Sequence, residues 1–145
     1  MTTATHTTPT TATVNPDYGT TLLRVTFGAL LLTHGIMKAF VWTVPGTVAF
    51  FGSIGLPPLV AYLVIFGELA GGTAILLGVL TRLASLLSIP LLLGAVWAHS
   101  ANGLIFSNPN GGWEFPAFLV LTAIAVALQG AGPLALGRLL PFLRA

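Results

Sequence analysis

Three ionisable residues lie within apolar parts of this sequence, and their types suit proton transfer and ligand binding. Glu68 is near the middle of an apolar stretch, and His34 and Lys38 are four residues apart in an earlier one. A carboxylate and an imidazole can give and take protons, while a lysine ammonium can hold an anionic or carbonyl group. We expect Glu68 and His34 to be catalytic and Lys38 to bind a ligand. The simpler alternative for Glu68 is a protonated side chain that closes one hydrogen bond between helices.

Four further residues lie towards what we predict to be the same end of the molecule. His99 and Asn102 are three residues apart at the end of one apolar stretch, and Trp113 and Glu114 begin the next. Because residues three or four apart share a helix face, His99 and Asn102 could continue one polar surface. We predict that these four residues bind a ligand together with Lys38 in one polar pocket. The simpler alternatives are a histidine that only bonds at the membrane surface and a lysine that only extends to it.

The composition limits the cofactors that such a pocket could hold. The chain has no cysteine, which excludes iron–sulfur clusters, thiolate metal sites and thiol redox chemistry. It has no Glu-x-x-His pair for a di-iron site, and His34 and His99 should differ in depth, so neither metal nor haem is expected. A quinone, whose oxygens take up protons, fits the histidine, carboxylate and lysine side chains best. A small acidic or carbonyl ligand is the alternative.

The composition also indicates whether water or lipid surrounds the segments that carry these residues. Charged residues make up 6% of the 145 and apolar residues 55%, with a mean hydropathy of +0.97. An ordinary soluble domain has ~25% charged residues. So few charges cannot cover a water-facing surface, and we expect the lipid bilayer to surround the protein. The net charge of +2 gives no reason to expect a nucleic acid as partner.

Four apolar stretches are long enough to cross a bilayer as helices. Each has 19 to 23 residues, and a spanning helix needs ~20. We therefore predict an all-α integral membrane protein, folded as an antiparallel bundle of four transmembrane helices. The predicted helices are residues 20–40, 58–79, 82–100 and 114–136.

The segments around and between these stretches differ in composition. Residues 1–19 are rich in threonine and predict a disordered tail, and residues 137–145 form a short basic tail. Residues 20–136 then make one membrane domain. The longer link at residues 41–56 carries proline and aromatic residues, which is typical of a short helix at the membrane surface or a re-entrant segment.

The positive charges predict an orientation for this bundle. Four arginines fall on the side of the two termini, whereas only Lys38 lies towards the other side. Because positively charged loops stay in the cytoplasm, we expect both termini in the cytoplasm, and in a bacterium the two longer links would then face the periplasm. The four arginines are Arg24, Arg82, Arg138 and Arg144.

Several short motifs follow one another in a fixed order along residues 20–136. None is specific alone, but their order and spacing together are informative. They include Leu22-Leu23-Arg24, His34-Gly35-x-x-Lys38, Gly55-Leu56-Pro57, Glu68 with Gly71-Gly72, Leu77-Gly78-Val79-Leu80-Thr81-Arg82, His99-x-x-Asn102-Gly103 and Gly111-Gly112-Trp113-Glu114.

Together these motifs resemble the DoxX/DoxD-like family of small four-helix bacterial membrane proteins. The resemblance implies the fold, and it implies His34, Lys38, Glu68, His99 and Glu114 as site residues. Proteins named DoxD belong to a thiosulfate:quinone oxidoreductase with a second subunit, and other DoxX proteins are linked to soluble redox partners. The resemblance thus implies a redox-linked function, a quinone and a redox partner subunit.

Three functions remain open from the sequence. The first is a redox-linked inner-membrane protein, as an oxidoreductase subunit, with a quinone-type pocket in the outer half of the bundle. The second is a non-enzymatic membrane subunit that anchors or stabilises a partner complex, which the 55% apolar composition and short loops fit equally well. A homo- or hetero-oligomer is expected. The third is a proton-coupled transporter, which four short helices favour least.

Overall fold

A computed structural model describes residues 16–139 of the chain, and all secondary structure assigned in this range is helical. The predicted all-α fold is therefore confirmed over the described residues. The five α-helices are α1 (Pro16–Ile36), α2 (Val44–Ser53), α3 (Pro58–Leu77), α4 (Thr81–His99) and α5 (Glu114–Gln129). Three short helical turns accompany them: the π-helix η1 (Met37–Val41) and the 3-10 turns η2 (Ser100–Asn102) and η3 (Leu136–Arg138).

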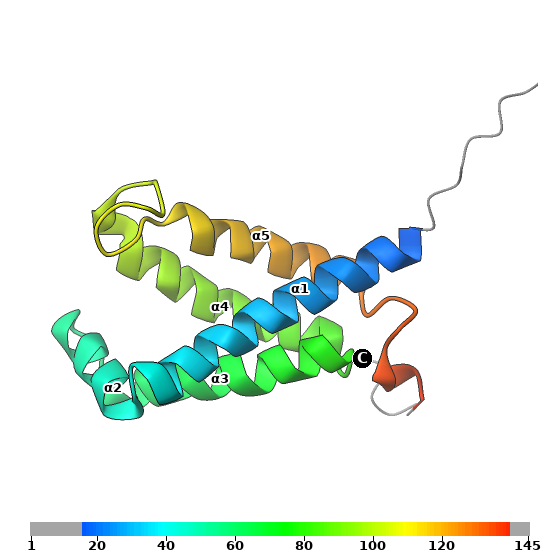
Figure 1. The fold of residues 1–145 in the computed structure, drawn as a ribbon, viewed down its shortest axis with the longest axis horizontal. Helices are drawn as coiled ribbons and strands as arrows, with labels where there is room; N and C mark the ends of the chain where they lie inside the picture. The colour runs from blue at the N-terminus through cyan, green and yellow to red at the C-terminus, as the bar shows by residue number, and fades with distance from the viewer. Residues whose placement is uncertain (1–15, 140–145) are drawn as a thin grey trace, which may run out of the picture.

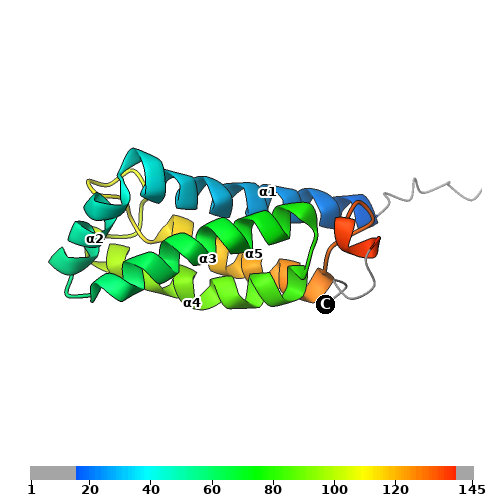
Figure 2. The ribbon, with the colours of Figure 1, turned by 90° about the horizontal axis from the view of Figure 1, so that it is seen from below.

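Helices α1, α3, α4 and α5 form a bundle in which neighbouring helices are antiparallel (Figures 1 and 2). The most extensive contacts join α1 to α3 and α4 to α5, and contacts of α3 with α4 and of α1 with α5 complete the ring. Helix α2 and the loop before α5 lie at one end, which we call the loop end. The start of α1, the turn between α3 and α4 and the segment after α5 lie at the termini end (Figure 2).

Helices α1 and α3 approach each other closely through glycines. A Cβ on Gly28 would lie 2.5 Å from the backbone nitrogen of Leu76, and a Cβ on Gly72 would lie 2.5 Å from that of Leu32. Real side chains do not tolerate such distances, so backbone meets backbone at this seam. Small residues that permit close approach are a principal means of helix association in lipid. The seam holds α1 and α3 in a fixed register.

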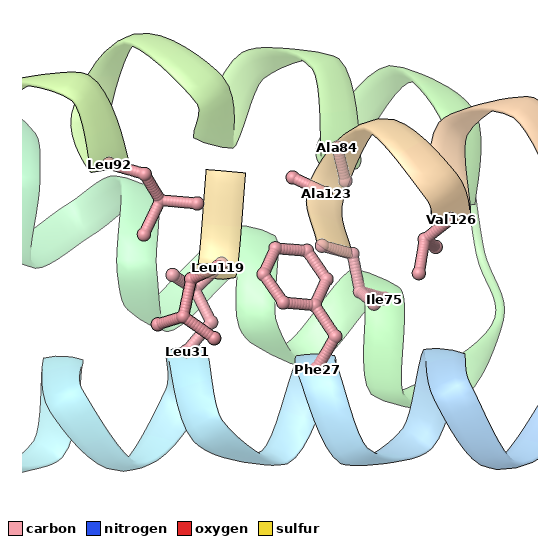
Figure 3. Packing of buried hydrophobic residues seen from close by; sticks show 8 residues of the cluster. All are labelled: Phe27, Leu31, Ile75, Ala84, Leu92, Leu119, Ala123 and Val126. Atoms are coloured by element: carbon pink, nitrogen blue, oxygen red, sulfur yellow. The ribbon is translucent and has the colours of Figure 1, made fainter. Parts of the chain in front are cut away.

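The centre of the bundle is a small apolar core between the four helices (Figure 3). Helix α1 places Phe27 against this core, and the other three helices surround that ring. The buried core residues are Phe27, Leu31, Ile75, Ala84, Leu92, Leu119, Ala123 and Val126.

The outer surface of the bundle is apolar. Large side chains such as Leu22, Phe66 and Leu128 are exposed on α1, α3 and α5. Three segments are long and apolar enough to cross a membrane, namely Tyr18–Val41, Pro58–Leu77 and Thr81–Asn102, while the apolar helix Glu114–Gln129 is shorter. The protein is therefore a multi-pass membrane protein, and a lipid bilayer is its expected surroundings.

Two helix boundaries differ from the prediction. Helix α5 ends at Gln129 instead of residue 136, because Gly130 and Gly132 adopt positive φ angles of 85° and 71° and turn the chain out of the helix. Helix α1 begins at Pro16, earlier than the predicted residue 20. Most of the predicted threonine-rich tail lies outside the described residues, as does the end of the predicted basic tail. The link 41–56 contains helix α2, which agrees with both predicted alternatives, a short helix at the membrane surface or a re-entrant segment.

Arg24, which the sequence places on the side of the termini, is buried inside the bundle. It is only 1% exposed, and its guanidinium donates hydrogen bonds to the carbonyl oxygens of Ile75 at 2.8 Å, Leu76 at 2.6 Å and Leu134 at 2.6 Å. The last carbonyls of a helix have no partner within it and carry partial negative charge. Arg24 therefore fastens the end of α3 and the segment after α5 to α1. It is not one of the loop charges that would set the orientation.

Candidate functional site

A buried ion pair joins α3 to the end of the first helical segment. The Lys38 ammonium lies 2.7 Å from Oε1 and 2.8 Å from Oε2 of Glu68. The side chains of Lys38 and Glu68 are 15% and 9% exposed. A charge inside a membrane helix bundle is costly unless it is paired, so each group makes the other tolerable there. Because the ammonium has three hydrogens and uses two on Glu68, one donor remains for a ligand.

The two partners are positioned by different local structures. Glu68 lies in the middle of α3, which starts cleanly at Pro58 because Pro57 is extended and a proline suits the first helical position. Lys38 lies in η1, where the helix widens and the Trp42 amide donates to the Met37 carbonyl at 2.8 Å. Single π turns within α-helical segments occur often at functional sites.

His34 completes this group, one turn before Lys38. Its Nδ1 donates to the Leu30 carbonyl at 2.8 Å, so the neutral ring keeps Nε2 free to accept a proton. Gly35, next to His34, packs against Leu69, next to Glu68, so the imidazole lies near the level of Glu68. Its ring centre lies 6.1 Å from that of Phe115 on α5. We call His34, Lys38 and Glu68 the ion-pair site.

The other predicted site residues belong to a second group. Both His99 and Asn102 donate to the carbonyl oxygens of Asn110, at 3.0 and 3.2 Å, and of Gly111, at 3.2 and 2.9 Å. Oε1 of Glu114 accepts a hydrogen bond from the backbone amide of Phe106 at 2.9 Å. These bonds fasten the loop between α4 and α5.

We call His99, Asn102, Asn108 and Glu114 the loop network. Asn108 belongs to it because its side chain donates to the Asn102 carbonyl at 2.9 Å. Trp113 adjoins the network through its backbone amide, which donates to the Gly103 carbonyl at 3.1 Å, while its side chain is exposed. Within residues 16–139, none of these bonds reaches the ion-pair site. The structure thus brings together three of the seven predicted site residues and places the other four around the loop.

Two residues near the ion-pair site were not predicted as site residues. Thr47 of α2 donates its hydroxyl hydrogen to the Lys38 carbonyl at 2.8 Å, and Phe115 packs against the His34 ring. No spacing pattern links Thr47 to Lys38, because a turn and a change of direction separate them. The sequence feature that could have indicated Phe115 is its position next to Glu114 at the start of a predicted helix.

The structure also bears on cofactors. Among the described residues, no group of three histidine, aspartate or glutamate side chains converges as a metal site would require. A groove of about 230 Å³ lies between α3 and α4. Its walls are almost entirely apolar, and none of the ion-pair site residues lines it. The polar chemistry is therefore at the seam of α1 and α3 and not in this groove.

Comparison with known proteins gives two matches. The family model named DoxX matches residues 19–101, a range that includes the whole ion-pair site. The chain is also 38% identical over 120 residues to the protein named "Putative oxidoreductase CatD" of Bacillus subtilis (strain 168), covering 83% of this chain and 85% of that protein. No solved structure matches the chain.

Proposed function

This chain belongs to the DoxX family of membrane proteins, and we propose that it is a redox-linked protein that binds a quinone head group at the ion-pair site. The observation that carries the proposal is the largely buried Lys38–Glu68 pair, with His34 one turn before Lys38. Intramembrane ionisable residues are functional more often than structural. The oxidoreductase name of the Bacillus relative supports a redox role.

The chemistry of the three side chains fits a quinone. A quinone that receives two electrons from a redox partner protein takes up two protons, one at each of its oxygens. The free hydrogen of the Lys38 ammonium would donate to one of these oxygens, because the other two hydrogens are used on Glu68. His34 would hold a proton at Nε2 and pass it to the bound group, and Glu68 would keep the ammonium charged and in place.

The proposed membrane arrangement has four spans, with α5 as the fourth. Its 16 residues extend about 24 Å, against a hydrocarbon core of about 30 Å. The apolar segment that follows Gln129 would cover the remaining depth. With Arg82 and Arg138 at the termini end, we propose that this end faces the cytoplasm of a bacterium and that the loop end faces outward.

The test is the quinone content of the protein purified in a mild detergent. We expect the wild type to carry extractable quinone, and Glu68→Gln to lower its affinity about tenfold because the lysine loses its charged partner. His34→Gln should lower it as well. Glu114→Gln makes the same chemical change in the loop network and should lower affinity by less than about twofold. The proposal would be contradicted if the wild-type protein carried no quinone. It would also be contradicted if Glu68→Gln and His34→Gln bound quinone as tightly as the wild type.

A second candidate function is that of a non-catalytic subunit that anchors a partner protein. It is favoured by the loop tip, where Leu104, Ile105 and Phe106 are all exposed although the loop network fixes the backbone beneath them. Gentle extraction followed by mass spectrometry should then recover a stoichiometric partner. That partner should be lost with Ile105→Ser and retained with Glu68→Gln. Under the quinone proposal, by contrast, bound quinone should be lost with Glu68→Gln and retained with Ile105→Ser.

A further inference from the structure

We infer that Thr47 is a positioning residue for the ion-pair site and that α2 serves to deliver it. Thr47 is the one residue of α2 that is buried, with 3% of its surface exposed. Its hydroxyl donates to the Lys38 carbonyl at 2.8 Å. Thr47 touches neither Glu68 nor the Lys38 ammonium through any hydrogen bond in the described structure, so it acts through the backbone of Lys38.

The Lys38 carbonyl needs such a partner. The helical segment ends with η1 at Val41, and the last carbonyls of a helix find no amide within it. An unpaired carbonyl in a membrane bundle is costly, because no water is available there to replace the missing bond. The Thr47 hydroxyl supplies the partner from a separate helix and thereby fixes the backbone from which the Lys38 side chain extends.

The chain adopts a strained conformation to bring Thr47 to this place. Thr43, which caps the start of α2, has φ 63° and ψ 154°, a region that is essentially restricted to glycine. Its hydroxyl accepts a hydrogen bond from the Gly46 amide at 3.3 Å, and its carbonyl accepts one from the Thr47 amide at 2.9 Å. The sharp turn at Thr43 reverses the chain so that α2 folds back against η1 and α3. Backbone strain of this kind gathers at functional sites.

The geometry of the ion pair explains why the backbone must be held. The ammonium is nearly equidistant from the two oxygens of Glu68, at 2.7 and 2.8 Å. Functional groups need support that keeps them within about 0.5 Å of the working position. Without the Thr47 bond, the end of η1 could move, and the flexible lysine side chain would lose this symmetric contact.

The composition of the chain offers a specific probe. Lys38 is the only lysine in the sequence, so labelling with 15N-lysine gives a single side-chain ammonium resonance. Its position and its rate of hydrogen exchange with water report the contact with Glu68 directly. This readout does not require a quinone. The positioning inference rests on the proposed function for one consequence only. Variants that shift the Lys38 ammonium resonance should also bind quinone less tightly.

The test compares Thr47→Val, which removes the hydroxyl and keeps the shape, with Thr47→Ser, which keeps the hydroxyl. We expect Thr47→Val to shift the Lys38 resonance towards its position in Glu68→Gln and to speed exchange about fivefold, as for the loss of one hydrogen bond. Thr47→Ser should retain the wild-type signal. Thr73→Val is the matched control, because the Thr73 hydroxyl bonds only to the Leu69 carbonyl of its own helix at 2.7 Å on an exposed face.

The outcomes separate this inference from the proposed function. An unchanged Lys38 resonance in folded Thr47→Val would overturn the positioning role, whatever happens to quinone. A shifted resonance with no quinone bound in the wild type would support the positioning role and contradict the quinone proposal. If Thr47→Val does not fold in detergent, Thr47→Ala is measured in its place, and the same shift is expected.

Discussion

The helical segment formed by α1 and η1 carries two cations, one buried and one largely buried, whose partners differ in kind. Arg24 at the termini end is held by three backbone carbonyls, whereas Lys38 towards the loop end is held by the carboxylate of Glu68. The two are 14 residues apart, or about 21 Å along a helix. Both face the same neighbour, α3, across the glycine seam.

The difference in partners implies a difference in role. A carbonyl cannot be protonated, and a guanidinium does not lose its proton in proteins, so the contacts of Arg24 stay the same whatever the protein binds. Lys38 and Glu68 can both exchange protons, and His34 beside them can carry one. The Arg24 end is therefore suited to holding helices together, and the Lys38 end is suited to chemistry.

The largest effect should come from removing the cation at the Arg24 end. Arg24→Met leaves one buried and two partly buried carbonyls without this donor, and we expect it to lower the free energy of unfolding by about 3 kcal/mol. Arg82→Met removes an exposed arginine and should lower it by less than about 0.5 kcal/mol. Unfolding by sodium dodecyl sulfate, followed by tryptophan fluorescence, measures both. Equal stability of the two variants would show that Arg24 does not hold the bundle together.

Removing one charge at the Lys38 end should destabilise the protein less, and removing both should restore much of the loss. Glu68→Gln leaves a buried ammonium without its carboxylate, at a cost of about 2 kcal/mol. The double variant Lys38→Met with Glu68→Met removes the unpaired charge and should be more stable than either single variant. A double-mutant cycle in detergent checks this. Additive losses would mean that the two side chains do not interact.

The seam between the two ends should be sensitive to a single methyl group. Gly28→Ala would push the α1 backbone away from Leu76, and we expect a loss of about 1 to 2 kcal/mol. It should also displace the Lys38 ammonium resonance, since the seam sets the register of α1 on α3. Gly94→Ala is the control, because nothing lies within 4 Å of a Cβ there. Its thermal midpoint should equal or exceed that of the wild type.

The smallest effect on stability should come from the loop network. His99→Leu removes one donor to the loop carbonyls, at a cost of about 1 kcal/mol or less. Hydrogen exchange at residues 103–113 should become about fivefold faster, while exchange in α1 and α3 is unchanged. Unchanged or slower hydrogen exchange in the loop would contradict the role of His99. An altered Lys38 resonance would mean that the loop network and the ion-pair site communicate.

Much of this arrangement could be predicted because it depends on position along the chain. Glu68 stands out as a carboxylate in an apolar helix, and the spacing of four between His34 and Lys38 predicts that they lie one turn apart on one helical segment. An antiparallel neighbour then brings Glu68 to their level.

Two kinds of feature could not be predicted from the sequence. These are the directions in which side chains point around the bundle and the local geometry of the backbone. His99 and Glu114 lie towards the predicted end, but spacing gives no information on which way their side chains point, and they turn to the loop. The role of Arg24 in joining α1 to α3 could not be predicted, because its partners are backbone carbonyls, which leave no trace in a sequence. Thr47 reaches Lys38 only because of the π turn and the sharp turn at Thr43.

The most direct test of the central claim is a quinone titration followed at Lys38. The protein, labelled with 15N-lysine, is titrated in detergent with a short-chain benzoquinone, and the single ammonium resonance is recorded. If the ion-pair site binds the quinone head group, the resonance moves saturably in the wild type and moves much less in Glu68→Gln. A resonance that stays in place in the folded wild-type protein at saturating quinone would contradict the claim.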